Sequence, residues 1–500
     1  MKNKLLHIIR TKPVFLYLLP VFFVLHGFAE NYDLIPVKNA VILVLVYSGV
    51  AFILSLLFWL LYRNFLKANL MAFLLLSYQF FYGSVHNFLK DNFAGSFIAK
   101  YSFILPFTIV VLTIIVIYIK KTKAAFTATT KYLNWLFLLL IFIDTGTLLL
   151  KLTKKNKEPA VNFSKYFSDC DTCSKPDIYL ILADEYAGQT ELQDIFGFDN
   201  SPFLNELKKR NYHVVANSRG NYNFTHYAMA SMLNMDYLSG ISGDHSSRHD
   251  LSISFNTLKK SKALHYFLNQ GYEFYNYSVF DFKHHPSPAA PSFIPRKTIP
   301  ITSQTFLYRL RKDLGYHLIT TLKLKSAISK LYYTDLYNNE KIYELTMAIG
   351  AKKTTNPKFV YTHLVMPHYR YYFDSKGQPA PFEKITDDNY CTNKNAYTEY
   401  LQYTNGKLLA LIDNIAKSAE KPPVIILMSD HGYHQFTGKE ADTIDKKYYF
   451  MTLNAISFPN GNYSAFYDSM SNVNQFRVIL NSLFRQQLPL LKDSTILLAQ

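Results

Sequence analysis

The chain has 500 residues and a formal net charge of +17, and this length predicts at least two folding units rather than one small domain. Leu, Ile, Val and Phe dominate residues 1–150 in long runs, whereas the remainder has the composition of an ordinary globular protein rich in Tyr and Asn. The positive charge does not indicate nucleic-acid binding, because the sequence has no basic, aromatic-interleaved motif of a DNA- or RNA-binding module.

The first 150 residues contain five apolar stretches that are candidate membrane-spanning helices, since about 20 apolar residues cross a bilayer. The first stretch is short, but it lacks the small-residue cleavage site of a signal peptide, and four more stretches follow it. Five in succession, with so few charges, argue against buried core helices. The sequence therefore predicts a membrane domain of five helices over 1–150, with spans at about 14–28, 40–61, 70–89, 101–119 and 132–150.

Lys and Arg residues in the short loops indicate the orientation, because basic loops stay on the cytoplasmic side. Basic residues precede the first stretch and follow the second and the fourth, whereas the other two loops are mixed or nearly neutral. The amino terminus is therefore expected inside. Five spans then place the rest of this multi-pass plasma-membrane protein on the extracytoplasmic face. The lysines at 151, 154, 155 and 157 oppose this bias, and they can instead meet anionic lipid head groups.

Two cysteines lie in the linker predicted over 151–176. Cys170 and Cys173 can pair as a small disulfide in an oxidising exterior. A zinc site needs more ligands than this segment supplies, and a thioredoxin-like redox pair would follow a strand. Cys391 has no clear role.

Two apolar runs, far apart in sequence, are typical of buried parallel strands and end in residues that bind metals. The first ends in Asp184 and Glu185, and the second ends in Asp430 and His431. The functional crevice of an open α/β sheet lies outside the carboxyl ends of its strands, so these side chains can hold a divalent cation between them. Either run alone is weak evidence, because Asp also ends strands as a turn former.

Helices and strands alternate around these runs, which predicts an α/β domain over 177–500 with a mainly parallel central sheet flanked by helices. The segment 303–329 is basic and amphipathic; it could rest on the membrane near a lipid substrate, or it could be an ordinary surface helix. The other expected strands are 212–215, 273–277 and 359–365, and the expected helices are 200–210, 257–269 and 397–415.

A loop rich in Gly and Asn over 218–224 leads into a helix of small and apolar residues, with Thr225 near the helix start. Free backbone N–H groups and the positive dipole end favour an anion at such a place. A hydroxyl beside a metal there can lose its proton and attack phosphorus or sulfur. The loop sequence alone favours a simpler interpretation, in which Thr225 only caps the helix.

Four motifs in this order resemble the alkaline phosphatase and sulfatase superfamily. The chain is more closely similar to the membrane-anchored phosphoglycerol and phosphoethanolamine transferases, including the lipoteichoic acid synthases. Those proteins have five membrane spans followed by an extracytoplasmic sulfatase-like domain, and the resemblance covers essentially the whole chain. The ordered set is specific, whereas each motif alone is not. The motifs are KPDIYLILADEY at 175–186, NYNFT at 221–225 with LNMDYL at 233–238, HLVMPH at 363–368 and SDHG at 429–432, and the tail SNVNQFRV at 471–478 also fits.

The resemblance implies that Asp184, Asp430 and His431 bind one divalent metal ion, which could be Mn, Zn or Mg. It also implies that Thr225 is a nucleophile held against this metal and that it forms a covalent phospho-enzyme. Glu185 is an ambiguous further ligand, since true sulfatases use two successive carboxylates where the transferases use one.

Three further histidines are implied as substrate contacts. His368 would contact the transferring group or protonate the leaving oxygen, and His434 is a plausible second contact. His363 is a weaker candidate, because a histidine within a strand is more often packed or hydrogen-bonded in the core.

Two departures from the family patterns bear on the chemistry. Formylglycine sulfatases need Cys or Ser as the nucleophile, followed by Pro and Arg two and four places on, whereas Thr225 is followed there by Tyr227 and Met229. This argues against ordinary sulfatase chemistry. Two-zinc relatives place an Asp where this chain offers Asn405, which argues for a single tightly bound metal.

Three functions stay open from the sequence. The first is a transferase that moves a phosphoglycerol or phosphoethanolamine head group from a membrane phospholipid donor to an envelope glycan or lipid acceptor. The second is a phosphodiesterase or phosphatase that uses the same nucleophile with water as acceptor. The third is a membrane scaffold with no activity, which the intact Asp184, Thr225, Asp430 and His431 argue against.

Overall fold

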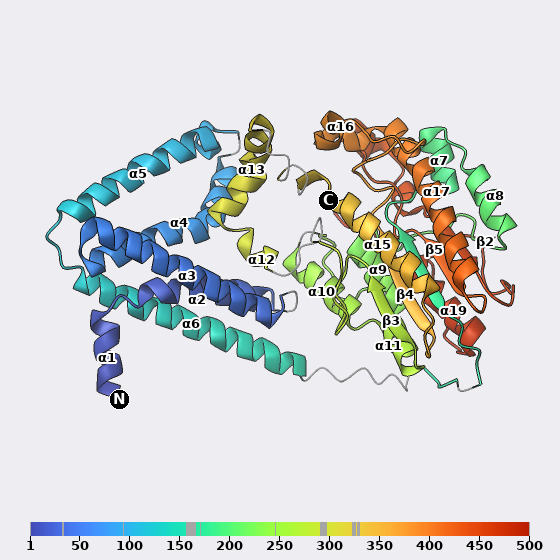
Figure 1. The fold of residues 1–500 in the computed structure, drawn as a ribbon, viewed down its shortest axis with the longest axis horizontal. Coiled ribbons are helices and arrows are strands. Elements are labelled where there is room, and N and C mark those ends of the chain that lie inside the picture. The colour runs from blue at the N-terminus through green and yellow to red at the C-terminus, as the bar shows by residue number, and fades with distance from the viewer. Residues whose placement is uncertain are drawn as a thin grey trace. The chain divides into compact units, whose positions relative to one another are not determined.

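The structure is a computed structural model that describes the chain except for residues 1, 33–34, 94, 157–166, 171, 246, 291–297, 323–326, 328–330 and 500. It divides into two compact units (Figure 1). Unit 1 is Met1–Ala160 together with Pro295–Lys325, and unit 2 is Val161–Ile294 together with Ser326–Gln500. Within the linker expected over 151–176, residues 157–166 and 171 lie outside the described residues, and the first part, to Asn156, belongs to a helix. Cys170 and Cys173 are joined by a disulfide, and Cys391 is free.

Unit 1 is a bundle of apolar helices. Four described helices are long and apolar enough to cross a membrane: α3 (Val37–Tyr62), α4 (Phe65–Asn92), α5 (Tyr101–Lys121) and α6 (Thr127–Asn156). The expected first span corresponds to α2 (Phe15–Glu30), which is apolar but has only 16 residues. At 1.5 Å per residue it is about 24 Å long, less than the ~30 Å hydrocarbon core. The expected count of five spanning helices is therefore not confirmed; four are.

A polar side chain inside the bundle forms hydrogen bonds with backbone groups at the ends of two helices. Asn134 of α6 is fully buried; it accepts a hydrogen bond from the Phe15 backbone N–H at 2.6 Å and donates to the carbonyls of Ile9 and Lys12, both at 2.7 Å. These bonds join the end of α1 (Lys2–Thr11) to the start of α2, where backbone groups have no partner within a helix. The short α2 is thereby tied into the bundle.

The segment expected to be amphipathic, 303–329, contains the helix α13 (Phe306–Thr321), which follows the short helix α12 (Ile299–Thr302). Both belong to unit 1, where α12 packs on α2 and α13 packs on α4. The chain enters this segment after β3 (Glu273–Tyr277) and returns to unit 2 before β4 (Lys358–Leu364).

Unit 2 contains one six-stranded sheet with the order β2-β6-β5-β1-β4-β3. The pairs β1–β4, β1–β5 and β3–β4 are parallel, whereas β5–β6 and β2–β6 are antiparallel. The sheet is thus mixed, and the expectation of a mainly parallel sheet holds only for its four-stranded core. The remaining strands are β1 (Ile178–Ala183), β2 (His213–Val214), β5 (Val424–Met428) and β6 (Asn454–Ser457).

Helices surround this sheet (Figure 1). The long α17 (Lys394–Ser418) packs on α15 (Thr334–Ala351), which in turn packs on β4, and α11 (Lys262–Asn269) packs on β3. The expected helices at 200–210 and 397–415 are present, whereas the one at 257–269 is divided at Ser261. The other helices are α7 (Gln189–Phe196), α8 (Ser201–Lys209), α9 (Thr225–Asn234), α10 (Arg248–Lys259), α16 (Phe382–Thr386), α18 (Gly438–Thr443) and α19 (Gln475–Phe484).

Candidate metal centre

The sheet of unit 2 brings together the two strand ends that the sequence analysis singled out. β1 and β5 are parallel neighbours, with Leu182 opposite Met428. Parallel neighbours present their carboxyl ends at the same edge, so Asp184 after β1 meets Asp430 and His431 after β5. One ligand atom from each lies within 4.8 Å of the other two, and all three residues are buried.

Two carboxylate oxygens in this cluster have no hydrogen-bond partner among the described residues. They are Asp184 Oδ1 and Asp430 Oδ2, and both residues are fully buried. His431 Nε2 lies 3.8 Å from the first oxygen and 3.3 Å from the second. Burying an unpaired carboxylate is costly, and two adjacent carboxylates repel each other. These three atoms therefore fit a divalent cation, which O and N ligands of this kind bind.

The other sides of the ligands are held by neighbouring groups. Asp430 Oδ1 accepts hydrogen bonds from the Glu185 backbone N–H at 3.2 Å and from Ser429 Oγ at 3.3 Å. His431 Nδ1 lies 2.8 Å from the carbonyl of Gly432. A carbonyl only accepts, so Nδ1 carries the proton and the Nε2 lone pair is free to bind a metal.

His363 supports Asp184 from behind. His363 is fully buried, its Nε2 lies 3.0 Å from Asp184 Oδ2, and its Nδ1 lies 3.2 Å from Tyr361 Oη. Burial raises the pKa of Asp184, but the His363 hydrogen bond and the nearby imidazoles of His368 and His431 outweigh it and lower the pKa. His363 thus orients the carboxylate of a candidate metal ligand, and this geometry favours a positioning role over the substrate contact that the resemblance implied.

Thr225 is the first residue of α9, and its hydroxyl meets the cluster. Thr225 Oγ1 lies 3.3 Å from His431 Nε2, and the residue is 6% exposed. The N-cap position belongs to Phe224, which makes no side-chain cap bond. The interpretation of Thr225 as the helix cap is therefore wrong. The hydroxyl stands where free backbone N–H groups at the start of α9 favour an anion.

Glu185 is fully buried but is not one of the three grouped ligands. Its carboxylate accepts hydrogen bonds from the His434 backbone N–H at 3.1 Å and from Gln435 Nε2 at 3.0 Å. Gln435 was not identified from the sequence, because its position three residues after Gly432 has no signal of its own. The geometry links Glu185 to the segment after β5 rather than to the three candidate metal ligands.

His368 and His434 lie on either side of the Glu185 carboxylate and differ in charge. His368 Nε2 is 3.7 Å from Oε2, and His434 Nδ1 is 3.4 Å from Oε1. Burial lowers the pKa of His368, but the carboxylates of Glu185 and Asp184 outweigh this and raise the pKa to about 9. Burial and the neighbouring His431 and His368 lower the pKa of His434 well below its ordinary value. One imidazole is therefore a proton donor at neutral pH, while the other is neutral.

Asn405, considered above as the counterpart of a second-metal ligand, lies in a different network. Its side chain bonds to Tyr186 Oη at 2.5 Å and to Asn200 Oδ1 at 2.9 Å. This position supplies no ligand to the cluster.

The loop 218–224 is held by contacts that the sequence did not reveal. A Cβ atom at Gly220 would lie 2.3 Å from the Asp430 carbonyl oxygen, so this loop packs directly on the backbone of a ligand. Asn221 accepts a hydrogen bond from the Val473 N–H, and Asn223 exchanges hydrogen bonds with the backbone of Leu498. The asparagines of the motif thus fix the loop, and only Thr225 reaches the cluster.

No family model and no curated protein matches the chain. Solved structures resemble it at low identity, and the sequence motifs resemble the same kinds of protein. At TM-scores of 0.35–0.38 these likenesses do not assign an activity. One is the C-terminal periplasmic domain of EcEptC from Escherichia coli in complex with Zn, with 11% identity, TM-score 0.37, and coverage of 63% of this chain and 84% of that one. Another is the C-terminal periplasmic domain of the phosphoethanolamine transferase EptC from Campylobacter jejuni. Its identity is 14% and its TM-score 0.35, and the match covers 64% of this chain and 92% of that one. A third is BT1596, a 2-O GAG sulfatase. Its identity is 12% and its TM-score 0.38, and the match covers 65% of this chain and 73% of that one.

The close approach of Gly220 to Asp430 gives a test of the centre that leaves every ligand in place. Gly220→Ala should weaken binding of Zn or Mn by about 10–100-fold, the range seen when groups supporting metal ligands are changed. The added methyl displaces the Asp430 backbone. Isothermal titration of the full-length protein measures this affinity.

Two variants calibrate that measurement. Gly406→Ala should leave metal affinity unchanged, because a Cβ there meets nothing within 4 Å. Asp430→Ala should abolish binding. Equal affinities for Gly220→Ala and Gly406→Ala would mean that the metal does not lie against Asp430.

Proposed function

We propose that unit 2 is the catalytic domain of a metal-dependent transferase, with Thr225 as the nucleophile. In this proposal a phosphoglycerol or phosphoethanolamine group passes from a membrane phospholipid to an envelope glycan or lipid. The observation that supports it best is the Thr225 hydroxyl, at the start of a helix, beside two buried carboxylates with unpartnered oxygens. A bound divalent cation would supply Lewis acidity, lowering the pKa of the hydroxyl and offsetting charge on the phosphoryl oxygens.

In the first half-reaction Thr225 Oγ, having lost its proton, attacks the phosphorus of the donor phosphodiester. The bond between phosphorus and the diacylglycerol oxygen breaks, and the head group stays on Thr225 as a phosphodiester. His368 is positioned by Glu185 and protonated at neutral pH, so it can give the departing oxygen its proton. The backbone N–H groups at the start of α9 favour the negative phosphoryl group.

In the second half-reaction an acceptor hydroxyl attacks the same phosphorus, and Thr225 Oγ leaves. His368, now neutral, can take the acceptor's proton. Water in place of the acceptor would give a phosphodiesterase, and the products of the reaction distinguish the two. His434, neutral beside the cluster, is assigned to binding the substrate.

The covalent step is tested at Thr225. Wild-type protein incubated with phosphatidylglycerol or phosphatidylethanolamine should gain the mass of one phosphoglycerol or phosphoethanolamine group in intact-mass spectrometry. Thr225→Ser should keep this adduct, and Thr225→Ala should lose both adduct and turnover while still binding metal, because it removes no ligand charge.

The matched control is Thr346→Ala, since Thr346 is also fully buried and its hydroxyl bonds to Ile342 O and Thr362 Oγ1, each at 2.8 Å. It should lose about 1–3 kcal/mol of stability and keep the adduct. If Thr225→Ala turns over normally, the covalent mechanism has to be abandoned.

The role of His368 is tested by changing the leaving group. His368→Gln should slow head-group release from a phospholipid by about 10²–10⁴-fold, the usual contribution of a general acid. It should slow cleavage of a p-nitrophenyl phosphodiester much less, because p-nitrophenolate leaves without a proton. Steady-state rates with the two substrates give the comparison, and an equal loss on both would show that His368 only binds or positions the substrate.

We also propose that unit 1 is the membrane domain, that the amino terminus lies in the cytoplasm and that the catalytic domain is extracytoplasmic. The bias of basic loops supports this orientation. Protease added to intact cells should cleave unit 2 and leave an epitope at the amino terminus intact. Protection of unit 2 would contradict both the orientation and the envelope acceptor.

A further inference from the structure

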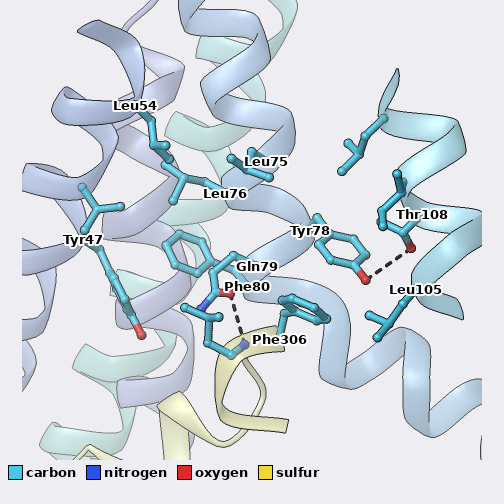
Figure 2. A pocket seen from close by; sticks show the side chains of 14 residues that line it. Tyr47, Leu54, Leu75, Leu76, Tyr78, Gln79, Phe80, Leu105, Thr108 and Phe306 are labelled. Atoms are coloured by element: carbon cyan, nitrogen blue, oxygen red, sulfur yellow. Dashed lines mark hydrogen bonds between the residues drawn. The ribbon is translucent and has the colours of Figure 1, made fainter. Parts of the chain in front are cut away.

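Unit 1 contains two adjoining apolar cavities of nearly equal size. The first, of about 530 Å³, lies between α3, α4, α5 and the start of α13 (Figure 2). The second, of about 540 Å³, lies between α4, α5 and the short helix η1 (Phe97–Ala99). Tyr78, Thr108 and Leu112 line both cavities and so form their common wall. Each volume falls within the range of small-molecule sites, about 300–1,000 Å³.

Some polar groups on these walls are hydrogen-bonded, whereas Ser77 Oγ, Tyr82 Oη and both ring nitrogens of His86, which line the second cavity, have no hydrogen-bond partner among the described residues. Thr108 Oγ1 donates to Tyr78 Oη at 3.3 Å, and Gln79 Oε1 accepts from the Leu307 backbone N–H at 3.3 Å (Figure 2). Most of the remaining lining of the first cavity is Leu, Val, Ile and Phe. Both cavities therefore offer mainly hydrocarbon surface, which suits an apolar chain.

Phe306 and Leu307 at the start of α13 line one side of the first cavity, and the segment α12–α13 is fixed to α4. The Gly83 N–H donates to the Gln304 carbonyl at 2.8 Å. A Cβ atom at Gly83 would lie 2.6 Å from that oxygen, so only glycine permits this approach. The Phe306 ring centroid lies 5.0 Å from that of Tyr78 and 4.9 Å from that of Tyr82. Part of the cavity wall is thus supplied by a segment whose chain neighbours belong to unit 2.

A charged cluster adjoins the second cavity, which His86 lines. Tyr101 Oη donates to Asp313 Oδ2 at 2.7 Å, and Lys90 Nζ lies 3.9 Å from the same oxygen. Arg309 donates to Ser303 O at 2.8 Å and to Asn87 Oδ1 at 3.0 Å. It also donates to Gln304 Oε1 at 3.5 Å. All three acceptors are neutral, so these bonds orient the guanidinium without offsetting its charge, and a guanidinium suits a phosphate.

We propose that unit 1 binds one diacyl phospholipid, with one acyl chain in each cavity and its phosphate at Arg309. Two apolar arms that share a wall, next to a cation, match the shape and charge of a two-chain phospholipid better than those of a single-chain or uncharged lipid. That this lipid is the donor of the head group rests on the proposed function; the binding itself does not.

Binding is measured on the full-length Thr225→Ala protein, so that turnover cannot consume the lipid. Native mass spectrometry with dipalmitoyl phosphatidylglycerol should show one retained lipid per protein. Leu112→Trp fills the common wall and should weaken retention by about tenfold or more, a factor equivalent to 1.4 kcal/mol. Leu139→Trp is the matched control, because Leu139 is 57% exposed on α6 and lines neither cavity.

Two further variants test the details. Leu105→Trp alters only the first cavity and should shift preference from the diacyl lipid to its single-chain lyso form. Arg309→Gln should remove the preference for the phospholipid over diacylglycerol. The proposal is overturned if Leu112→Trp and Leu139→Trp retain the lipid equally, or if the wild type prefers a single-chain or uncharged lipid. Leu105→Trp decides the matter should Leu112→Trp fail to fold.

Turnover separates this inference from the proposed function. In protein that keeps Thr225, Leu112→Trp should lower the turnover rate with dipalmitoyl phosphatidylglycerol about tenfold. The turnover rate with a soluble p-nitrophenyl phosphodiester is the reference for this loss. If lipid binding depends on the cavities but no head group is ever transferred, the proposed function fails and the lipid site stands. If transfer occurs and is insensitive to Leu112→Trp, the lipid site fails and the function stands.

Discussion

The parallel pairing of β1 with β5 brings two carboxylates, Asp184 and Asp430, to one buried place, and much of the surrounding structure depends on this repulsive arrangement. Like charges in a low-dielectric interior are stable only when hydrogen bonds and a counter-charge hold them. The backbone N–H of Glu185, the Ser429 hydroxyl and the His363 ring hold the outer oxygens. The inner oxygens have no such partner among the described residues, which leaves them for a cation.

The same constraint explains the short contacts around the loop 218–224. Gly220 lies against the carbonyl of Asp430, and Asn472 donates to the carbonyl of Ser429 at 3.0 Å. The backbone that carries the ligands is therefore fixed from two sides. Thr225 directly follows this loop, so the contacts that fix the loop also help to fix Thr225.

The sequence predicted this centre because its signals are local. A short apolar run followed by Asp marks both β1 and β5, and the edge at which they meet follows from parallel strands. β6 gives no such signal, since its four residues include Asn454 and Ser457. Its antiparallel pairing with β5 and β2, which makes the sheet mixed, depends on contacts with other strands and not on a local sequence pattern.

Long-range packing also explains the other differences. The fit of Gly83 against Gln304, which anchors α12–α13 to α4, joins residues more than 200 positions apart, and no local pattern marks it. The short α2 has the composition of a membrane span but not the length. In each case the sequence showed the character of a segment, and the structure showed what it packs against.

Burial alone does not make a buried carboxylate a ligand, as a comparison of Glu191 with Asp184 shows. Both are fully buried. Burial raises the pKa of Glu191 well above its ordinary range, and the neighbouring Glu185 raises it further, so Glu191 meets the cost of burial by keeping its proton. Asp184 has imidazoles beside it, and they lower its pKa in spite of burial. It stays ionised, and its unpartnered oxygen lies near a second carboxylate. The metal is therefore expected at Asp184, which is grouped with Asp430 and His431, and not at Glu191, which belongs to no such group among the described residues.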